Sequence, residues 1–346
     1  MRVLLRSLAV AWLAMTGRPD PGSAEVLTFA ELDGWHNDDH RAALVAFRAT
    51  CDTMTAPEWG PLCRLAAANA DTDAAARAFF ELFFRPLVIG DPPALFTGYY
   101  EPELAGSPYR TPRFAYPIYA KPPELTEGSP WYSRDAIESG GLLRGRGLEI
   151  AWLDDPVDVY FLQIQGSGRI KMPNGEVVRV GYAGKNGQPY RSIGQELVRR
   201  GSLTADQVSA PEIAAYVRAN PGTGSQLLAH NPSFVFFRKL ANLAADQGPI
   251  GAMGRSITTL RSVAVDPAYT PLGAPVWIEK DGRSPIRSLM IAQDTGGAIR
   301  GPQRADIFYG TGTGPGAGAA AGSVKDGGRM VVLLPIDQAY ALMPDG

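Results

Sequence analysis

Apolar and polar residues alternate with a helical period in the N-terminal part of the chain, from residue 28 to residue 90. In the segment DDHRAALVAFRATC the apolar residues recur at helical spacing, and Asp38 or Asp39 can cap the start of that helix. The segment DTDAAARAFFELFF repeats the pattern, with Asp71 or Asp73 at its start. Its phenylalanines form a wide apolar face, which we interpret as protein core rather than a binding surface.

The pattern changes at Leu95, where short apolar runs broken by Gly and Pro replace the helical spacing. Such runs predict strands and hairpins, and they are FTGYYEPELAGS, AYPIYAKP, DVYFLQIQGSGRIKM and VVRVGYAGKNGQPY. The Asn-Gly pair in PNGE predicts a hairpin turn. Helical spacing returns between residues 192 and 220, where Ser209 should cap a helix. The segment NPSFVFFRKL then returns to strand character.

The C-terminal part consists of short strand-like runs, namely TTLRSVAVD, PVWIEK, SLMIAQD, ADIFYG and RMVVLLP. No segment between them has the length and period of a crossover helix, which excludes a doubly wound parallel sheet. A compact β-barrel with interleaved loops fits this pattern. The stretch GTGTGPGAGAAAGSVKDGG lies between apolar runs, so we expect a structured turn and a short helix there.

Composition limits the size and the partners of the protein. The chain has 346 residues, 45% of them hydrophobic, which is enough for one large domain or two modest ones. Its 39 glycines and 29 prolines favour strands and turns over a helical bundle. The formal net charge is -2, and no cluster of lysine and arginine is dense enough to suggest a nucleic-acid partner.

The first residues have the pattern of a secretory signal peptide. Arg2 and Arg6 precede a short apolar run, Leu8 to Met15, and small residues follow up to Ala24. That run is too short to span a bilayer, and an ordinary buried N-terminal helix stays open as the alternative. We expect cleavage after residues 1–24 and a soluble periplasmic protein. No cysteine lies near this cut, so we expect no lipid anchor.

Cysteine and histidine are both scarce. Cys51 and Cys63 are the only cysteines, and a close pair in an exported protein suggests a disulfide, with two free buried thiols as the alternative. His36, His40 and His230 have no ligand-like spacing to cysteines or carboxylates. We therefore expect no metal site.

Three aspartates stand beside apolar strand-like runs: Asp266 in SVAVDP, Asp294 in LMIAQDTGG and Asp306 in RADIFYG. An ionised carboxylate costs several kcal/mol to bury unless it is paired or hydrogen-bonded. These acids must therefore cap backbone amides, bond one another or line a cleft. The glycines Gly296 and Gly297 let the backbone approach a ligand closely, which favours a cleft over simple loop capping.

The triplet Asp-Thr-Gly at Asp294 to Gly296 is also the active-site signature of aspartic proteases, whose barrels hold two carboxylates that share a proton. A single-chain enzyme of that kind needs a second triplet, and the sequence has none. Gly297 also follows the triplet where Ser or Ala is usual. We therefore disfavour proteolysis.

Carboxylates without histidine or metal also cleave glycosidic bonds. One protonated acid gives its proton to the leaving oxygen, and a second group or the sugar itself completes the reaction. A long saccharide also needs aromatic and hydrogen-bonding side chains, which TGYYEP, QIQGSG and GYAGKNGQPY supply. The residues that we expect to bind substrate are Thr97, Gly98, Tyr99, Tyr100, Glu101, Gln163, Gln165, Gly166, Ser167, Tyr182, Lys185, Asn186, Tyr190, Asp266, Gly296 and Gly297.

Several of these segments follow one another in a distinctive order: FTGYYEPEL, YFLQIQGSGRI, VGYAGKNGQPYRSIG, NPSFVFF, GPIGAMG, SVAVDPAYTPLGAPVWI and AQDTGGAIRGPQRADIFYG. Together they resemble the membrane-bound lytic murein transglycosylase A family. The resemblance covers about Leu27 to Pro335. The C-terminal part of that family is called the 3D domain after three aspartates, which match Asp266, Asp294 and Asp306.

The resemblance implies a mainly β fold with N-terminal helices. It consists of a double-psi β-barrel domain and a second, smaller β-domain, with the substrate groove between them. The expected division is a signal peptide at 1–24, helices and the first barrel strands at 25–105, an inserted β-rich domain at 106–243 and the 3D barrel region at 244–346.

The resemblance also implies an activity. Members of the family cleave the β-1,4 bond between N-acetylmuramic acid and N-acetylglucosamine without water and leave a 1,6-anhydromuramoyl end. The motif assigns the acid and base to Asp306, with Asp294 as its close neighbour. Burial and the Asp294 charge should raise the pKa of Asp306.

No cofactor is implied. The expected partners are the glycan strands of peptidoglycan, and cell-wall enzyme complexes are a further expectation for a protein that we expect to be a monomer. Two alternatives stay open: a hydrolase that activates water with both aspartates, and a non-catalytic protein that binds glycan.

Overall fold

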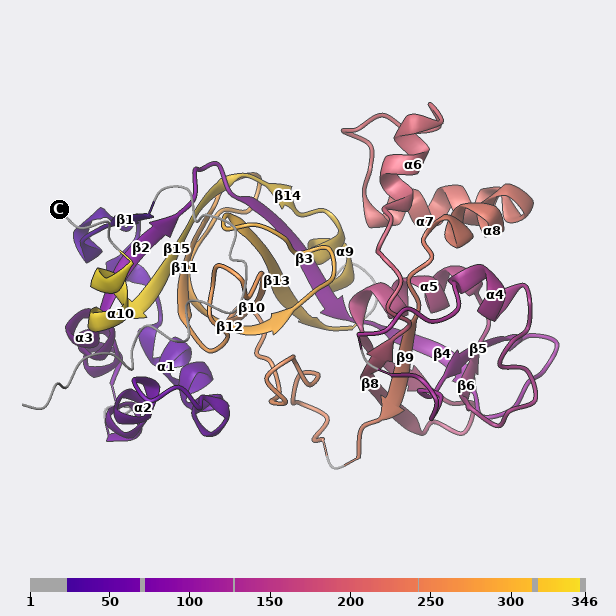
Figure 1. Cartoon of the computed structure of the whole chain (residues 1–346), viewed down its shortest axis with the longest axis horizontal. Coiled ribbons are helices and arrows are strands. Elements are labelled where there is room, and N and C mark those ends of the chain that lie inside the picture. The colour runs from indigo at the N-terminus through magenta and orange to yellow at the C-terminus, as the bar shows by residue number, and fades with distance from the viewer. Residues whose placement is uncertain (1–23, 69–71, 127, 242, 313–316, 343–346) are drawn as a thin grey trace, which may run out of the picture.

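Two β-sheets with helices around them make up the described part of the chain. The computed structural model describes residues 24–68, 72–126, 128–241, 243–312 and 317–342. Figure 1 shows a nine-stranded sheet on the left and a six-stranded sheet on the right. The mainly β character and the two-domain organisation are as predicted. The expected signal peptide falls outside the described residues, except for Ala24, where the first strand begins.

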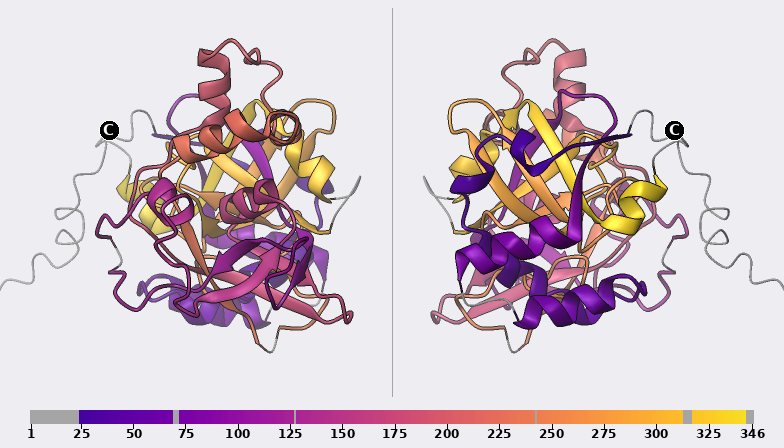
Figure 2. Two further views of the ribbon diagram at one scale, coloured as in Figure 1. Left: turned by 90° about the vertical axis from the view of Figure 1, so that its right-hand side faces the viewer. Right: turned by 90° about the vertical axis from the view of Figure 1, so that its left-hand side faces the viewer.

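Three helices form the N-terminal layer, α1 (His40–Arg48), α2 (Trp59–Ala68) and α3 (Asp73–Phe83). The carboxylate of Asp39 accepts a backbone hydrogen bond of 2.8 Å at the start of α1. Helix α3 begins at Asp73, but its cap is the hydroxyl of Thr72. A disulfide joins Cys51 to Cys63 of α2. These helices lie at the end of the molecule that faces away from the six-stranded sheet (Figure 2).

The nine-stranded sheet gathers strands from both ends of the chain. Its members are β1 (Ala24–Val26), β2 (Phe84–Ile89), β3 (Leu95–Glu101), β10 (Ser262–Val265), β11 (Pro275–Lys280), β12 (Ile286–Thr295), β13 (Arg304–Thr311), β14 (Lys325–Asp326) and β15 (Gly328–Pro335). Their order is β1-β2-β15-β11-β12-β10-β13-β3-β14. Strand β10 runs parallel to β12 and β13 runs parallel to β3, while the other pairs are antiparallel.

The C-terminal strand predictions are confirmed as β10, β11, β12, β13 and β15. Short helices α9 (Ala317–Gly322) and α10 (Ile336–Ala341) complete this part, and α9 confirms the helix expected in the Gly- and Ala-rich stretch. The sheet is mixed rather than doubly wound and parallel. Its double-psi topology stays a prediction.

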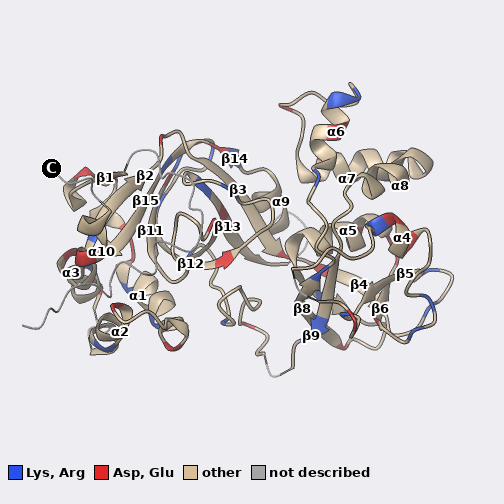
Figure 3. Cartoon of the chain, viewed as in Figure 1, with Lys and Arg blue, Asp and Glu red and all other residues tan. Residues whose placement is uncertain are grey.

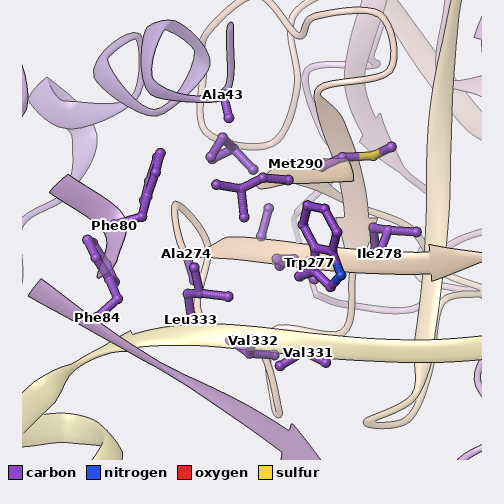
Figure 4. Close-up of a cluster of buried hydrophobic side chains, with 14 of the residues drawn as sticks. Ala43, Phe80, Phe84, Ala274, Trp277, Ile278, Met290, Val331, Val332 and Leu333 are labelled. Atoms are coloured by element: carbon purple, nitrogen blue, oxygen red, sulfur yellow. The ribbon is translucent and has the colours of Figure 1, made fainter. Parts of the chain in front are cut away.

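The core of this part lies between the sheet and the N-terminal helices (Figure 4). Trp277 of β11 is fully buried and packs edge-on against Trp35, with ring centroids 5.1 Å apart. Phe79, Phe80 and Phe84 are buried in the same cluster. The apolar face predicted for α3 and the residue after it is therefore core, as expected.

The six-stranded sheet has the order β5-β6-β4-β7-β8-β9. Its strands are β4 (Glu103–Ser107), β5 (Tyr116–Tyr119), β6 (Glu149–Leu153), β7 (Ser167–Lys171), β8 (Val177–Lys185) and β9 (Val235–Lys239). The predicted PNGE turn joins β7 to β8, and Gly175 donates its amide to the carbonyl of Met172 at 2.9 Å.

Five helices accompany this sheet: α4 (Arg134–Glu138), α5 (Pro156–Gln165), α6 (Ile193–Arg199), α7 (Ala210–Ala219) and α8 (Pro221–His230). Helices α6 and α7 confirm the predicted helical segment, and Ser209 caps α7 as expected. Helix α8 extends this segment beyond its predicted end. In Figure 1 the α6–α8 segment projects above the rest of this part.

The prediction of a strand in DVYFLQIQ is wrong, because this segment forms helix α5. Its residues are buried on almost every side, so the apolar run lacks the one-sided period of an exposed helix. The sequence nevertheless contains residues typical of the start and the end of a helix. Asp155 caps the helix, Pro156 occupies its first turn and Gly166 ends it with a positive φ of 77°.

A buried ionic cluster joins the two sheets where the chain passes from β3 to β4. Glu101 is fully buried and accepts hydrogen bonds from Arg179 at 2.8 Å and from Arg169 at 2.9 Å. Arg169 also donates to the carbonyl of Ala245 at 2.7 Å, on the segment that returns from β9 to β10. The cluster thus connects the two segments by which the chain passes between the sheets, β3 to β4 and β9 to β10.

Candidate active site

Four residues from four neighbouring strands stand in one row across the nine-stranded sheet. Asp294 of β12 is paired with Ala264 of β10, and Ala264 is also paired with Asp306 of β13. Asp306 is in turn paired with Thr97 of β3. Directly paired residues project to the same face of a sheet, so the row brings two carboxylates to one face.

Ala264 sets the space between these carboxylates. Neighbouring strands lie about 4.8 Å apart, so two steps across the sheet separate the Cα atoms of Asp294 and Asp306 by about 10 Å. The side chain between them is a single methyl group, and Ala264 lines the cleft described below. A larger residue at this position would fill the space between the acids.

Asp294 is held by three hydrogen-bond donors. Its Oδ1 accepts from the backbone amides of Ala252 at 3.0 Å and Thr295 at 2.9 Å. Its Oδ2 accepts from the hydroxyl of Tyr99 at 3.0 Å. Burial raises the pKa of Asp294 to about 6, and the three donors oppose this rise because they stabilise the ionised form.

Asp306 has a different environment. Its Oδ1 accepts a hydrogen bond of 2.6 Å from the hydroxyl of Thr97. Among the described residues, no hydrogen bond joins its Oδ2 to the protein, and the carboxyl opens onto the cleft. Burial raises the pKa of Asp306, while the Thr97 hydroxyl and the charge of Arg304 oppose the rise. This is an acid that can hold a proton and present it to a ligand.

Both aspartates line a cleft of about 860 Å³ between the two sheets. One wall comes from the nine-stranded part and includes the end of β12 and the loop after it, from Thr295 to Arg300. The opposite wall comes from the end of α5 and from β8 and β9. An elongated chain with many hydroxyl groups fits such a cleft better than a compact apolar ligand, because amide, hydroxyl and aromatic groups are spread along its wall.

Comparison with known proteins identifies the family. Family models of the MltA specific insert domain and the 3D domain match residues 95–238 and residues 261–334. The membrane-bound lytic murein transglycosylase A of Vibrio cholerae is 33% identical over 269 residues, which is 72% of this chain and 69% of the relative. The chain belongs to the MltA family.

Solved structures agree with this assignment. The membrane-bound lytic murein transglycosylase from Agrobacterium tumefaciens has 32% identity and a TM-score of 0.82, covering 92% of this chain and 99% of that chain. Escherichia coli MltA with bound chitohexaose has 27% identity and a TM-score of 0.70, covering 92% of this chain and 93% of that chain. The MltA family thus accounts for both sheets of the structure.

Most of the residues that we expected to bind substrate line the cleft of this MltA family member. They are Tyr99, Gln163, Gln165, Gly166, Ser167, Tyr182, Lys185, Tyr190, Gly296 and Gly297. The two glutamines stand on α5 and not on a strand. Thr97 is half-buried and outside the cleft lining, and it contacts the site through its hydrogen bond to Asp306.

Four other expected residues are outside the cleft lining. Glu101 and Asn186 are both fully buried, and Asn186 uses its side chain to bond backbone groups, such as the amide of Phe234 at 2.9 Å. A Cβ on Gly98 would come within 2.8 Å of the backbone of α9, so this glycine allows the helix to pack on β3. Tyr100 packs beside Gly318 of α9.

Asp266 also lies outside the cleft lining, in contrast to the other two aspartates of the 3D motif. It is 7% exposed, and its carboxylate accepts from the amides of Gly301 at 2.9 Å and Ala268 at 3.2 Å. Arg300 lies 3.7 Å from the same carboxylate. Asp266 therefore holds the end of the loop that carries the cleft residues Gly296 and Gly297.

Sequence reasoning missed several residues of the site. Arg134 is 1% exposed and orients Gln163 through a 2.7 Å hydrogen bond, but it lies on a short helix that no motif marked. Ala252, whose amide holds Asp294, falls in the GPIGAMG segment, where the glycines were a signal that we did not use. Arg304 stands two residues before Asp306. Its contact with Thr97 could not be read from the sequence, because it depends on the pairing of β13 with β3.

Among the residues that the structure describes, no group of three or more His, Cys, Asp or Glu side chains could hold a metal ion. Within the same residues, no helix combines the length and apolar character needed to cross a membrane.

Proposed function

We propose that this protein is a lytic transglycosylase that cleaves the β-1,4 bond between N-acetylmuramic acid and N-acetylglucosamine of peptidoglycan and leaves 1,6-anhydromuramoyl ends. The observation that carries the proposal is the carboxyl group of Asp306, whose Oδ1 accepts a hydrogen bond from Thr97 while its Oδ2 opens onto the cleft. Membership of the MltA family and the relatives named lytic murein transglycosylases support the same activity.

In the first half of the reaction, protonated Asp306 gives its proton to the glycosidic oxygen, and the bond from that oxygen to C1 of the muramoyl residue breaks. The raised pKa of Asp306 supports this role, because an acid must keep its proton until the bond breaks. Positive charge develops at C1 as the leaving group departs. Asp294, held in its ionised form by three donors, would stabilise that charge.

In the second half, the Asp306 carboxylate accepts the proton of the muramoyl C6 hydroxyl as that oxygen bonds to C1. The proton count balances, since Asp306 ends as it began. The nucleophile belongs to the substrate, so no enzyme nucleophile and no water are consumed.

The remaining assignments follow from this function. We propose cleavage in the periplasm after export, glycan strands as the substrate, no cofactor and a monomeric enzyme that joins cell-wall complexes. We also propose the double-psi topology for the nine-stranded part, with the inserted domain at 106–243 and the 3D region at 244–346.

The test is mass spectrometry of murein sacculi digested with the protein, with Asp306→Asn and with Asp281→Asn, an exposed aspartate of an ion pair, as control. Anhydro-muropeptides from the protein and the control, and none from Asp306→Asn, are expected. Reducing ends instead would establish a hydrolase that uses both aspartates. Binding to sacculi without any product would establish a non-catalytic glycan-binding protein.

A further inference from the structure

A chain of two hydrogen bonds leads from Arg304 through Thr97 to Asp306. The guanidinium of Arg304 donates to Oγ1 of Thr97 at 2.8 Å. The same Oγ1 donates to Oδ1 of Asp306 at 2.6 Å. Arg304 and Asp306 lie two positions apart on β13, and Thr97 is the partner of Asp306 on β3, so all three side chains share one face of the sheet.

The direction of these bonds has only one solution. A guanidinium has five N–H donors and no acceptor, so the bond from Arg304 must use a lone pair of the Thr97 oxygen. The single hydroxyl proton of Thr97 is then free, and it points to Asp306, the acceptor at 2.6 Å. Oδ1 of Asp306 therefore accepts a hydrogen bond from the Thr97 hydroxyl, whose proton stays on the threonine oxygen.

The Thr97 side chain also lies between the guanidinium of Arg304 and the carboxylate of Asp306 in the hydrogen-bond chain. Arg304 makes its other hydrogen bonds to the carbonyls of Ala305 at 2.6 Å and Leu95 at 3.3 Å. Among the described residues, no salt bridge joins Arg304 to Asp306. A direct arginine–carboxylate pair would hold the acid in its ionised form and remove its proton.

We propose that Arg304 and Thr97 are positioning residues that place the transferable proton of Asp306 on Oδ2, the oxygen that opens onto the cleft. The proposal rests on the function proposed above, in which Asp306 is the acid. If Oδ1 carried the proton, it would point into the protein, and the Thr97 hydroxyl would lose its acceptor. With Thr97 donating, the same Oδ2 gives up the proton and takes it back from the C6 hydroxyl.

The groups that face Asp306 determine the pH dependence of the reaction. Arg304 lies on the same strand, Asp294 on β12, and Tyr99 on β3, while Tyr309 follows on β13. Removal of either the Thr97 hydroxyl or the Arg304 charge takes away a group that lowers the pKa of Asp306. Either change should move the alkaline limb of the rate profile to higher pH, because the acid then keeps its proton longer.

The decisive pair of variants is Thr97→Val, which keeps the shape of the side chain but removes the hydroxyl, and Thr97→Ser, which keeps the hydroxyl. Release of anhydro ends from soluble uncrosslinked glycan strands gives kcat, KM and the pH profile. For Thr97→Val we expect a kcat about 100-fold lower, a KM within about 3-fold and an alkaline limb at higher pH. Thr97→Ser should keep kcat within about 3-fold of the unmodified protein, and its pH profile should match that of the unmodified protein.

Arg304→Gln is the independent variant, because it removes the charge and leaves Thr97 in place. It should lower kcat about 10-fold and move the alkaline limb in the same direction. Thermal unfolding and binding of chitohexaose verify that each variant is folded. If Thr97→Val does not fold, the Arg304→Gln variant tests the proposal alone. An unchanged pH profile of Arg304→Gln then overturns the proposal.

Two further outcomes would overturn it: a folded Thr97→Val with unchanged kcat, or equal losses in Thr97→Val and Thr97→Ser. Asp306→Asn separates this proposal from the proposed function. An Asp306→Asn variant that still makes anhydro ends refutes the function itself, whereas an inactive Asp306→Asn beside a fully active Thr97→Val refutes only the positioning role.

Discussion

The two sheets form the walls of one cleft, but they are built differently. The nine-stranded part has one large apolar core that includes the N-terminal helices, and a separate small cluster of Tyr99, Ile257, Ala264, Ile299 and Phe308 beside the cleft aspartates. The six-stranded part divides its buried residues among three smaller clusters. Both cleft aspartates come from the first part, and the second part contributes amides, aromatic rings and basic groups. Figure 3 shows acidic and basic residues interspersed over both parts.

This difference follows from what each wall must do. The pKa of a buried acid depends on the surrounding atoms to within a fraction of an ångström, so it needs a support that does not shift. A sugar chain is bound through many separate contacts, and each of them can be lost at small cost. The acids therefore stand on strands of the part with the large core, and the part with the smaller clusters supplies many of the other cleft-lining residues.

Among these predictions, a change in the buried ionic cluster that joins the two parts should have the largest effect, on the free energy of unfolding. Glu101→Gln leaves Arg169 and Arg179 buried without the charge that they share, so we expect a loss of about 3–5 kcal/mol in unfolding free energy. Urea denaturation measures it. Glu124→Gln, which breaks an exposed pair with Arg146, should leave stability almost unchanged because solvent screens that pair. Equal effects of the two variants would show that the cluster does not hold the parts together.

On the nine-stranded side, Asp294→Asn should lower kcat about 100-fold, or about 2.7 kcal/mol, with a smaller change in KM. In the proposed reaction the neutral amide removes the negative charge that stabilises C1, and it meets the Tyr99, Ala252 and Thr295 donors with one oxygen instead of two. Steady-state kinetics on soluble glycan strands measure this. An unchanged kcat would limit Asp294 to a structural role.

On the six-stranded side, Tyr182→Ala should act on binding alone. Tyr182 lines the cleft and is 43% exposed, so its ring offers a surface to a sugar. We expect KM to rise about 10-fold, or about 1.4 kcal/mol, and kcat to stay within about 2-fold. Tyr109→Ala, an exposed tyrosine outside the cleft lining, is the control. A fall in kcat with unchanged KM would contradict the division of labour between the walls.

The smallest effect concerns His40, behind the nine-stranded sheet. It is fully buried, and both ring nitrogens lack a hydrogen-bond partner among the described residues, although Asp73 lies 3.7 Å away. Burial lowers the pKa of His40, with Asp38 and Asp73 raising it and Arg77 lowering it further.

Because the folded protein binds the His40 proton less tightly than the unfolded chain does, stability is complete above the unfolded pKa of about 6.5 and declines as pH falls below it. We expect the unfolding free energy to fall between pH 7 and pH 5. In His40→Leu this part of the pH dependence should disappear. An identical slope in both proteins would exclude His40 as its source.

Local features of the fold were predictable from the sequence. The cap at Asp39, the cap at Ser209 and the PNGE turn depend on residues within a few positions of one another, so a short segment contains the whole signal. Helix α5 was not predicted, since its apolar residues reflect burial on most sides rather than a helical period. There the tertiary environment outweighed the pattern.

The candidate site was predictable in part. The segment around Asp294 and Asp306 marked both acids, and the tyrosine and glutamine segments marked much of the cleft lining. Glu101 stands in the same segment as Tyr99, yet it bonds two arginines in the interior. Composition does not separate these roles, because a carboxylate on a strand end looks the same in sequence whether it meets solvent or a buried guanidinium.

The sequence by itself determined the elements with local signals, the closely spaced cysteines and the kind of chemistry that aspartates without histidine can perform. Only the tertiary structure decided that Ala264 separates Asp294 from Asp306 and that one oxygen of Asp306 is held by Thr97, a residue 209 positions away. The physical reason is that caps and turns are made within one stretch of backbone, whereas strand register and the direction of a hydrogen bond arise only when distant strands pair.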